Sequence, residues 1–274
     1  MENDCLRKTA TLIHHQPVAD GIYKMTLYEP DLAIAAQPGQ FAMFSLNGEA
    51  GLFLRRPFSF ADIDRDTGTV AILYQVTGKG TKYMAEWETG RLVDVLGPLG
   101  RGFTIEEHAG RAILAGGGMG IAPLLFLARE LSALGKDLVV FAGARSSNLL
   151  FGISQFQAFG CRIQIATEDG SDGAKGFVTL PLEDHLKEHA RGARADGNTM
   201  LYACGPAPFL QAVAGLCERY HQEAEISLEE RMGCGFGVCM GCSVQIRSAD
   251  GTIRQKRVCH DGPVFTAGEV LFHG

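Results

Sequence analysis

The sequence predicts three structural units: an antiparallel β-barrel over residues 1–102, a doubly wound parallel α/β sheet over residues 103–225, and a small cysteine-rich unit over residues 226–274. Three observations carry this prediction. Short β-rich runs separated by turn residues fill the first part, strand and helix patterns alternate in the second, and closely spaced cysteines and glycines mark the third. A length of 274 residues suits two or three domains.

The first unit contains several strand-length runs rich in β-branched and aromatic residues, at residues 22–27, 40–45 and 70–76. Turn signals separate the runs at residues 37–39, 47–48 and 66–68. Short strands at this spacing predict an antiparallel barrel. One stretch of the unit, residues 81–88, has a clear helical pattern.

Two segments of the predicted barrel suggest phosphate or ring binding. In Arg55-Arg56-Pro57-Phe58-Ser59, a fixed guanidinium suits two pyrophosphate oxygens, and strand alternation places Arg56 and Phe58 on one side and Ser59 on the other. Taken alone, an Arg-Pro pair at a strand edge is more often solvated surface.

The second segment is residues 76–81, which contain Gly78, Gly80 and Thr81 between a strand and a helix. The amides there and the helix N-terminus suit a phosphate. Taken alone, an ordinary strand-to-helix turn is the more common explanation of such a pattern.

Residues 101–110 form a predicted linker, after which strands and helices alternate. Strands are predicted at residues 111–115, 137–142, 161–167, 200–203 and 224–228, and helices at 123–134, 179–189 and 206–221. The βαβ pattern favours a parallel sheet with its ligand edge at the carboxyl ends of the strands.

A glycine-rich turn follows the first of these strands. The residues that predict a dinucleotide pyrophosphate there are Gly116, Gly117, Gly118, Gly120 and Pro123. Pro123 stands where the G-x-G-x-x-G fingerprint has its third glycine, although proline suits the first turn of a helix. A tight packing turn is the alternative interpretation.

A second candidate, Cys204-Gly205-Pro206, follows a later strand and is expected on the same edge of the sheet. Cys204 is placed to touch a nicotinamide ring, although by residue type it is more often a buried packing thiol.

The cysteines of the third unit have ferredoxin-type spacing. Cys234, Cys239 and Cys242 follow the pattern C-x4-C-x2-C, and sixteen residues separate Cys242 from Cys259. This is the plant-type spacing for a [2Fe–2S] cluster, and the intervening glycines bring backbone amides near the sulfurs. A hairpin with a turn at residues 248–251 accounts for the longer gap. Structural zinc, which usually shows two C-x2-C pairs, is the alternative.

Composition excludes some classes of function. The net charge of −6 gives no electrostatic basis for binding nucleic acid. No apolar run approaches the length of a membrane span, and the acidic start of the chain does not resemble a secretory leader. These features, with many cysteines, predict a cytoplasmic protein.

The order of these motifs resembles the ferredoxin–NADP reductase superfamily, whose barrel binds FAD and whose α/β domain binds a nicotinamide dinucleotide. From Ser227-Leu228-Glu229-Glu230-Arg231 into the cysteine loop, the sequence is similar to the electron-transfer subunits of NAD-dependent (type B) dihydroorotate dehydrogenases. The resemblance extends over essentially the whole chain.

The resemblance implies a role for each motif. It assigns Arg56 to a flavin phosphate, Ser59 to the reactive edge of the flavin, and Phe58 to stacking in place of the tyrosine found in many reductases. Further flavin contacts are implied for Pro57, Leu73, Tyr74, Gln75, Gly78, Gly80 and Thr81. Cluster ligation is implied for Cys234, Cys239, Cys242 and Cys259. The resemblance favours NAD over NADP, although Arg145 follows a strand where a 2′-phosphate contact is possible and a surface turn arginine is more common.

The three units leave no part of the chain to oxidise an organic substrate, so the cluster unit is expected to face a partner. The resemblance implies a catalytic subunit that carries FMN and oxidises dihydroorotate, in a heterotetramer with two of each subunit. Electrons would pass to the [2Fe–2S] cluster, then to FAD and NAD, because a flavin joins one-electron and hydride chemistry. No side chain need act as acid or base. The alternatives are a flavin and iron–sulfur subunit of another complex, such as a ferredoxin-coupled transhydrogenase or a sulfide or hydrogenase-type reductase, and a zinc-binding structural module.

Overall fold

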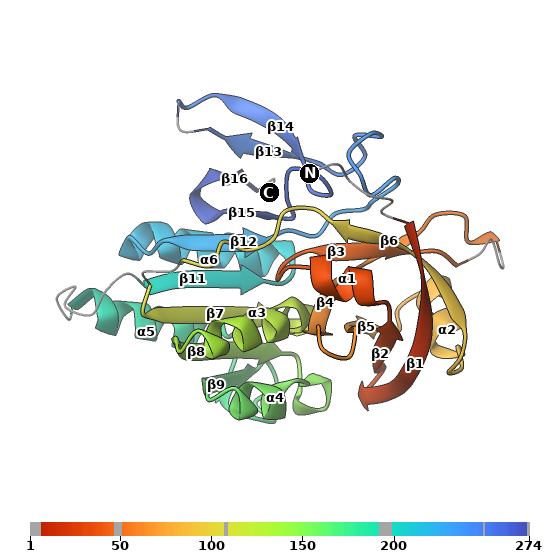
Figure 1. Cartoon of the computed structure of the whole chain (residues 1–274). Helices are drawn as coiled ribbons and strands as arrows, with labels where there is room; N and C mark the ends of the chain where they lie inside the picture. Colours follow the sequence, from red (N-terminus) through yellow and green to blue (C-terminus); the bar gives the residue numbers. More distant parts are fainter. Residues whose placement is uncertain (1–6, 47–50, 107–108, 192–198, 249, 273–274) are drawn as a thin grey trace.

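The structure, a computed structural model, describes residues 7–46, 51–106, 109–191, 199–248 and 250–272. It contains the predicted barrel and the predicted parallel sheet, with the cysteine-rich segment packed above both (Figure 1). The turn signal at residues 47–48, the acidic start of the chain and Ala249 of the hairpin turn lie outside the described residues.

The first unit is a closed barrel with the strand order β1-β2-β5-β4-β3-β6. Its strands are β1 (Arg7–Ala19), β2 (Ile22–Tyr28), β3 (Phe41–Phe44), β4 (Arg56–Asp64), β5 (Thr69–Gln75) and β6 (Leu92–Leu99). Alternate residues of β6 are buried, as strand periodicity requires when one face meets a core. Closure leaves no unpaired edge, because β1 pairs with both β2 and β6.

Two short helices belong to the barrel. Helix α2 (Lys79–Ala85) corresponds to the helix predicted at residues 81–88, but it begins two residues earlier, with Gly78 as its N-cap. Helix α1 (Pro30–Ala35) was not anticipated, because six residues give too little periodicity to detect. Its start is nevertheless encoded locally: Pro30 occupies the first turn, and the Glu29 carboxylate accepts a hydrogen bond from the Leu32 amide.

The second unit is a seven-stranded sheet with the order β10-β9-β8-β7-β11-β12-β15. Its parallel strands are β7 (Arg111–Gly117), β8 (Asp137–Ala144), β9 (Arg162–Thr167), β10 (Ala174–Lys175), β11 (Thr199–Cys204) and β12 (Ala224–Ser227). All but the first residue of β8 are buried, because helices cover both faces of the sheet.

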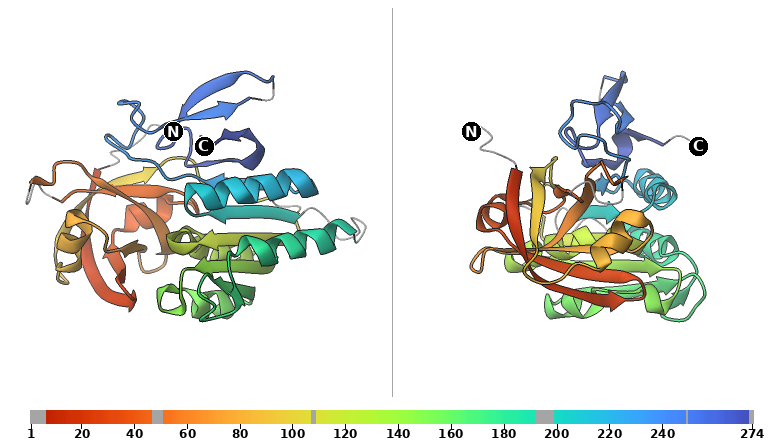
Figure 2. Two further views of the ribbon diagram at one scale, coloured as in Figure 1. Left: turned by 180° about the vertical axis from the view of Figure 1, so that it is seen from behind. Right: turned by 90° about the vertical axis from the view of Figure 1, so that its right-hand side faces the viewer.

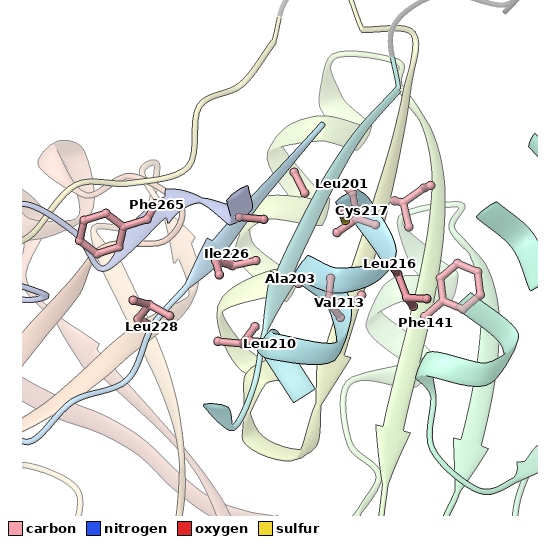
Figure 3. Close-up of a cluster of buried hydrophobic side chains, with 14 of the residues drawn as sticks. Phe141, Leu201, Ala203, Leu210, Val213, Leu216, Cys217, Ile226, Leu228 and Phe265 are labelled. Atoms are coloured by element: carbon pink, nitrogen blue, oxygen red, sulfur yellow. The ribbon is translucent and has the colours of Figure 1, made fainter. Parts of the chain in front are cut away.

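The covering helices lie in two pairs. Helices α3 (Ile121–Ala133) and α4 (Ile153–Ala158) cover one face, and α5 (Thr179–Arg191) and α6 (Ala207–Tyr220) cover the other (Figures 1 and 2). Leu210, Val213 and Leu216 of α6 pack onto the strands of the sheet (Figure 3). Helix α4 is another six-residue helix that the sequence pattern does not reveal.

The cysteine-rich segment contributes its own strands. The predicted hairpin is present as β13 (Ser243–Arg247) and β14 (Ile253–Arg257), and β16 (Val270–Leu271) pairs with β13. Strand β15 (Val264–Thr266) instead returns to the large sheet and pairs antiparallel with β12. One core cluster accordingly joins the barrel, the sheet and this segment, and it includes Met43, Leu201 and Cys259.

In the described part of the chain, no helix combines the length and apolar character needed to cross a membrane.

Candidate functional site

A cavity of about 1050 Å³ lies between the barrel and the carboxyl edge of the parallel sheet. Most of the residues proposed from the sequence for flavin or nucleotide binding line it: Pro57, Phe58, Ser59, Leu73, Tyr74, Gln75, Thr81, Gly117, Gly118, Gly120, Pro123, Cys204, Gly205 and Pro206. The others, Arg56, Gly78, Gly80 and Gly116, are not among the lining residues. The fold therefore brings motifs far apart in sequence to one place.

The barrel wall of the cavity is aromatic and tightly held. The rings of Phe58 and Tyr74 lie 5.6 Å apart between centroids on neighbouring strands. The Tyr74 hydroxyl lies 2.8 Å from Nε2 of His15, whose Nδ1 lies 2.9 Å from the Trp87 carbonyl. Because a carbonyl only accepts, Nδ1 carries the proton and Tyr74 donates to Nε2. Burial raises the pKa of Tyr74, so its hydroxyl stays protonated.

Arg56 lies beside the cavity against the start of α2. A Cβ at Gly80 would stand 3.1 Å from Nε of Arg56 and 3.0 Å from Cδ1 of Leu46. The absence of a side chain at Gly80 therefore gives the Arg56 guanidinium the room it occupies. The Thr81 hydroxyl accepts hydrogen bonds from the Thr77 and Gly78 amides at 2.9 and 3.1 Å. These two amides are thus already paired, and Nη1 of Arg56 donates to the Leu54 carbonyl, so a phosphate in this corner would meet the remaining N–H groups of the arginine fork.

The opposite wall is built from two interlocked turns. Gly120 lies in the turn that follows β7, and Cys204 is the last residue of β11. A Cβ at Gly120 would overlap the Cys204 carbonyl and would stand 2.5 Å from the Gly205 amide nitrogen. Gly116 has a packing role in the same turn, since a Cβ there would stand 2.8 Å from Cγ1 of Ile121. Only glycine permits this approach, which exposes the backbone of both turns to the cavity.

Cys204, Ser227 and Glu229 form a polar group on this wall, and all three line the cavity. Burial raises the pKa of Cys204 to about 12, with a further contribution from the Glu229 charge, although the Ser227 hydroxyl opposes the shift. The thiol is therefore neutral. Solvent reaches Glu229 through the cavity, but the surrounding protein desolvates its carboxyl and raises its pKa. Together these groups supply hydrogen-bond donors and acceptors to a ring bound in the cavity.

Two charged residues stand where neighbouring strands end. Arg145 follows β8 and Glu168 follows β9, and both line the cavity. Glu168 was not predicted from the sequence, because it follows the third strand of the sheet in chain order, much further from the glycine-rich turn than the acidic residue of the dinucleotide fingerprint.

The four cysteines of the C-terminal segment are arranged as two pairs. The Cys239 amide lies 3.5 Å from Sγ of Cys234, and the Cys259 amide lies 3.4 Å from Sγ of Cys242. The thiols within each pair also interact, and Cys234 interacts electrostatically with Cys259. Among the described residues, no three His, Cys, Asp or Glu side chains surround a single metal-sized point. Two pairs fit the two irons of a [2Fe–2S] cluster better than the single ion of a zinc site.

The backbone of the cysteine loop, residues 234–242, favours the thiolate form of Cys234. Desolvation opposes ionisation of Cys234, but the backbone amides of Cys239, Phe236 and Val238 outweigh it and lower the pKa of Cys234 to about 6. A Cβ at Gly233 or Gly241 would stand 3.3 or 3.5 Å from Sγ of Cys239, so both glycines give that sulfur room.

The cysteine loop packs directly against the wall of the cavity. Gly235 has a φ of 84°, and a Cβ there would stand 2.6 Å from Cγ of Met43 on β3. Phe41, on the same strand, lines the cavity, as does Met232, two residues before Cys234. The two sites therefore share a wall made of β3 and the segment that leads into the loop.

Comparison with known proteins identifies the family. Over 268 residues the chain is 40% identical to the electron transfer subunit of dihydroorotate dehydrogenase B (NAD(+)) of Bacillus caldolyticus, covering 97% of this chain and 98% of that one. The chain belongs to this family. The corresponding subunit of Desulforamulus reducens is 38% identical over 255 residues, covering 93% of this chain and 94% of that one.

Family models match two parts of the chain. Residues 229–271 match the iron–sulfur cluster binding domain of dihydroorotate dehydrogenase B, and residues 114–215 match the oxidoreductase NAD-binding domain. The chain is thus an oxidoreductase subunit with an iron–sulfur domain and an NAD-binding domain.

Solved structures give the same architecture. A structure of NADH-dependent reduced ferredoxin-NADP oxidoreductase, described for flavin-based electron bifurcation, superposes with a TM-score of 0.82 at 27% identity, covering 98% of this chain and 91% of that one. Phthalate dioxygenase reductase superposes with a TM-score of 0.63 at 18% identity, covering 93% and 77%. At this identity the superposition shows a shared fold.

Proposed function

We propose that the chain carries electrons from an FMN-containing dihydroorotate dehydrogenase catalytic subunit, through a [2Fe–2S] cluster and FAD, to NAD⁺ in pyrimidine biosynthesis. The observation that supports this most directly is the wall between the cavity and the cysteine loop: Phe41 and Met232 line the cavity, and Gly235 of the loop packs on Met43, which lies on the same strand as Phe41. Electron carriers must lie close together, and this packing brings the two sites into contact.

The proposed assignments follow the walls of the cavity. Phe58, Ser59, Leu73, Tyr74 and Gln75 would hold the flavin, with Arg56 at its phosphate. The turns at Gly117–Gly120 and at Cys204–Pro206 would hold the nicotinamide dinucleotide, with Pro123 beginning the helix beneath it. Cys234 and Cys239 would bind one iron, and Cys242 and Cys259 the other.

The bound flavin supplies the chemistry that joins single-electron and hydride transfer. The protein holds and shields the reacting groups. The Phe58 and Tyr74 rings exclude water from one wall, and the neutral thiol of Cys204 and the carboxyl group of Glu229 place hydrogen-bonding groups on the other. None of these roles requires the chain to oxidise an organic substrate, which supports a partner for that step.

The proposed units are residues 1–102 for FAD, 103–225 for NAD and 226–274 for the cluster, with β15 of the last unit completing the sheet of the second. A heterotetramer with two of each subunit is the proposed assembly. We place the complex in the cytoplasm, because the described cysteines are all free and cluster thiolates require reducing conditions.

The outer face of the cysteine loop is the proposed docking surface for the catalytic subunit. This cluster face consists of Phe236, Val238 and Met240, whose exposed fractions are 46%, 74% and 50%. Met240 has a φ of 60°, a backbone conformation that costs methionine more free energy than it would cost glycine. Its exposed side chain is therefore present in spite of this energetic cost. Adjacent exposed apolar side chains typically mark a protein interface.

We expect Val238→Glu to weaken binding of the catalytic subunit by about tenfold or more, because an unpaired carboxylate would have to be buried. Co-purification and analytical ultracentrifugation measure the effect. Leu134→Glu is the matched control, because Leu134 is 58% exposed at the end of α3. Equal binding by the two variants would place the docking surface elsewhere.

Glu168 is the proposed determinant of NAD specificity. Its carboxylate would accept a hydrogen bond from a ribose 2′-hydroxyl and would repel a 2′-phosphate, whereas Arg145 would attract one. In Glu168→Gln, the preference for NADH over NADPH in kcat/KM should fall by about tenfold. This corresponds to a loss of about 1.4 kcal/mol in the free energy that discriminates between the two nucleotides. Steady-state reduction of a dye by each nucleotide tests this, with exposed Asp184→Asn as control. An unchanged preference would show that Glu168 does not contact the ribose.

The proposed function is tested by co-purification from the native source followed by a dihydroorotate:NAD⁺ assay and cofactor analysis. An FMN-containing partner, iron, sulfide and FAD are expected. Absence of dihydroorotate oxidation with both cofactors present would refute the assignment to this reaction, and zinc without flavin would refute electron transfer altogether.

A ferredoxin-coupled NADH–NADP reductase is the second candidate, favoured by the structural superposition at a TM-score of 0.82. Sequence identity of 40% to the dihydroorotate dehydrogenase subunit, against 27% to that reductase, supports the first candidate. A ferredoxin-dependent activity without dihydroorotate activity would reverse this order.

A further inference from the structure

Arg257 joins the two halves of the cysteine ligand set. It ends β14, two residues before Cys259. Its Nη1 donates a hydrogen bond of 2.8 Å to the carbonyl of Gly237, which lies in the cysteine loop between Cys234 and Cys239. The guanidinium therefore adds a side-chain link between the loop that carries three cysteines and the turn that carries the fourth, beside the backbone contacts of Val258 and Cys259 to Cys242.

The other arm of the arginine is fixed by Asp261. Nε and Nη2 donate to the two carboxylate oxygens at 2.9 and 3.2 Å, and the Arg257 amide donates to the same carboxylate at 2.8 Å. Nη2 also lies 3.1 Å from Nδ1 of His260. The side chains of Arg257 and Asp261 are only 28% and 18% exposed, which sets this pair apart from ordinary surface ion pairs.

The loop fits closely against this turn. Gly237 has a φ of 88°, and a Cβ there would stand 2.8 Å from Cβ of His260. The guanidinium is held at the carbonyl of a residue between Cys234 and Cys239, and its own residue lies two positions before Cys259, so its positive charge stands beside the cysteine ligand set. It thus has two effects: it holds the loop in place, and it brings a positive charge to an anionic thiolate site.

We propose that Arg257 is the positioning residue of the cluster site. Its guanidinium, oriented by Asp261, holds the cysteine loop in place through a hydrogen bond to the Gly237 carbonyl, and it raises the reduction potential of the cluster. The inference rests on the proposed [2Fe–2S] cluster, but it concerns retention and tuning of the cluster and does not depend on the identity of the partner.

The test compares the purified wild-type chain with Arg257→Gln, Arg257→Lys and Arg254→Gln. Arg254 is the matched control, because it lies on the same strand and pairs with exposed Asp250, away from the cysteines. The measurements are the rate at which a chelator bleaches the cluster spectrum, the midpoint potential by spectroscopic titration, and FAD content.

In Arg257→Gln the cluster should bleach about tenfold faster, since a charge-assisted hydrogen bond is lost, and the midpoint potential should fall while FAD content stays unchanged. Arg257→Lys keeps the charge without the planar fork, so its potential should stay near the wild-type value while bleaching accelerates. Arg254→Gln should match the wild type. Wild-type bleaching and potential in Arg257→Gln would overturn the proposal. Absence of a cluster from the wild-type chain would refute the proposed function instead.

Discussion

Cys239→Ser should abolish electron transfer from dihydroorotate to NAD⁺ in the reconstituted complex while leaving NADH oxidation by an artificial flavin acceptor close to wild type. Cys239 is the exposed member of its pair, and its backbone amide faces Sγ of Cys234 at 3.5 Å. A serine hydroxyl ionises far less readily than a thiol and is a poorer iron ligand. The cavity residues are untouched, so the flavin and nucleotide sites should persist.

The expected loss in dihydroorotate:NAD⁺ activity exceeds about 100-fold, beyond the range typical for outer-shell changes at metal sites. Ferricyanide reduction by NADH and FAD content measure the other half of the chain. Cys161→Ser, at a buried cysteine of the α/β domain, is the control and should leave both activities intact. If both activities of Cys239→Ser fell together with FAD retained, the cluster and the flavin would not act in sequence as proposed.

Gly120→Ala should unfold or severely loosen the α/β domain. The new methyl group would overlap the carbonyl of Cys204 and stand 2.5 Å from the Gly205 nitrogen, and these atoms belong to backbone between β11 and α6. Flexible side chains can move aside, but this backbone is fixed by the sheet, so relief requires separating the two turns. A loss of about 3 kcal/mol or more in the free energy of unfolding is expected.

Urea unfolding and NADH binding measure this effect. Gly215→Ala is the matched control, because Gly215 lies within α6 and a Cβ there meets nothing within 4 Å. That variant should gain about 0.5–1 kcal/mol from helix propensity. A Gly120→Ala protein that kept wild-type stability and NADH affinity would show that the two turns are not locked together.

The predictable parts of the fold are those governed by local periodicity. Parallel strands such as β8 are continuous apolar runs, and the cysteine spacing follows from the geometry of the cluster. Strand β1, which closes the barrel, was not singled out, because most of its thirteen residues are exposed or half-buried and its apolar signal is weak. Strand β15 has three residues, too few for any pattern.

The candidate site likewise contains residues that could be predicted from the sequence and residues that could not. Its glycines, aromatic residues and cysteines belong to motifs whose spacing reflects a local turn or loop. Glu168 and Arg257 belong to no such motif, and Glu229 lies in the segment that carries the family resemblance but receives no role from it. Their positions acquire meaning only when strand ends and loops from different parts of the chain meet, which single-sequence patterns do not encode. The amides of Thr77 and Gly78 show the opposite case, a local motif whose predicted role changes in the structure. The motif suggested that they bind a phosphate, but they donate to the Thr81 hydroxyl, and this pairing depends on a side-chain rotamer.

Strand β15 has a consequence for how the chain is made and how it can evolve. It follows the cysteine loop in sequence, yet it covers the edge of β12 in the nucleotide-binding sheet. During synthesis that edge stays open until the loop has left the ribosome, so an unfinished chain presents a strand ready to pair with a neighbour. The iron–sulfur segment is therefore not an exchangeable module: a gene fusion or deletion that removes it also removes the strand that keeps the adjoining domain from aggregating.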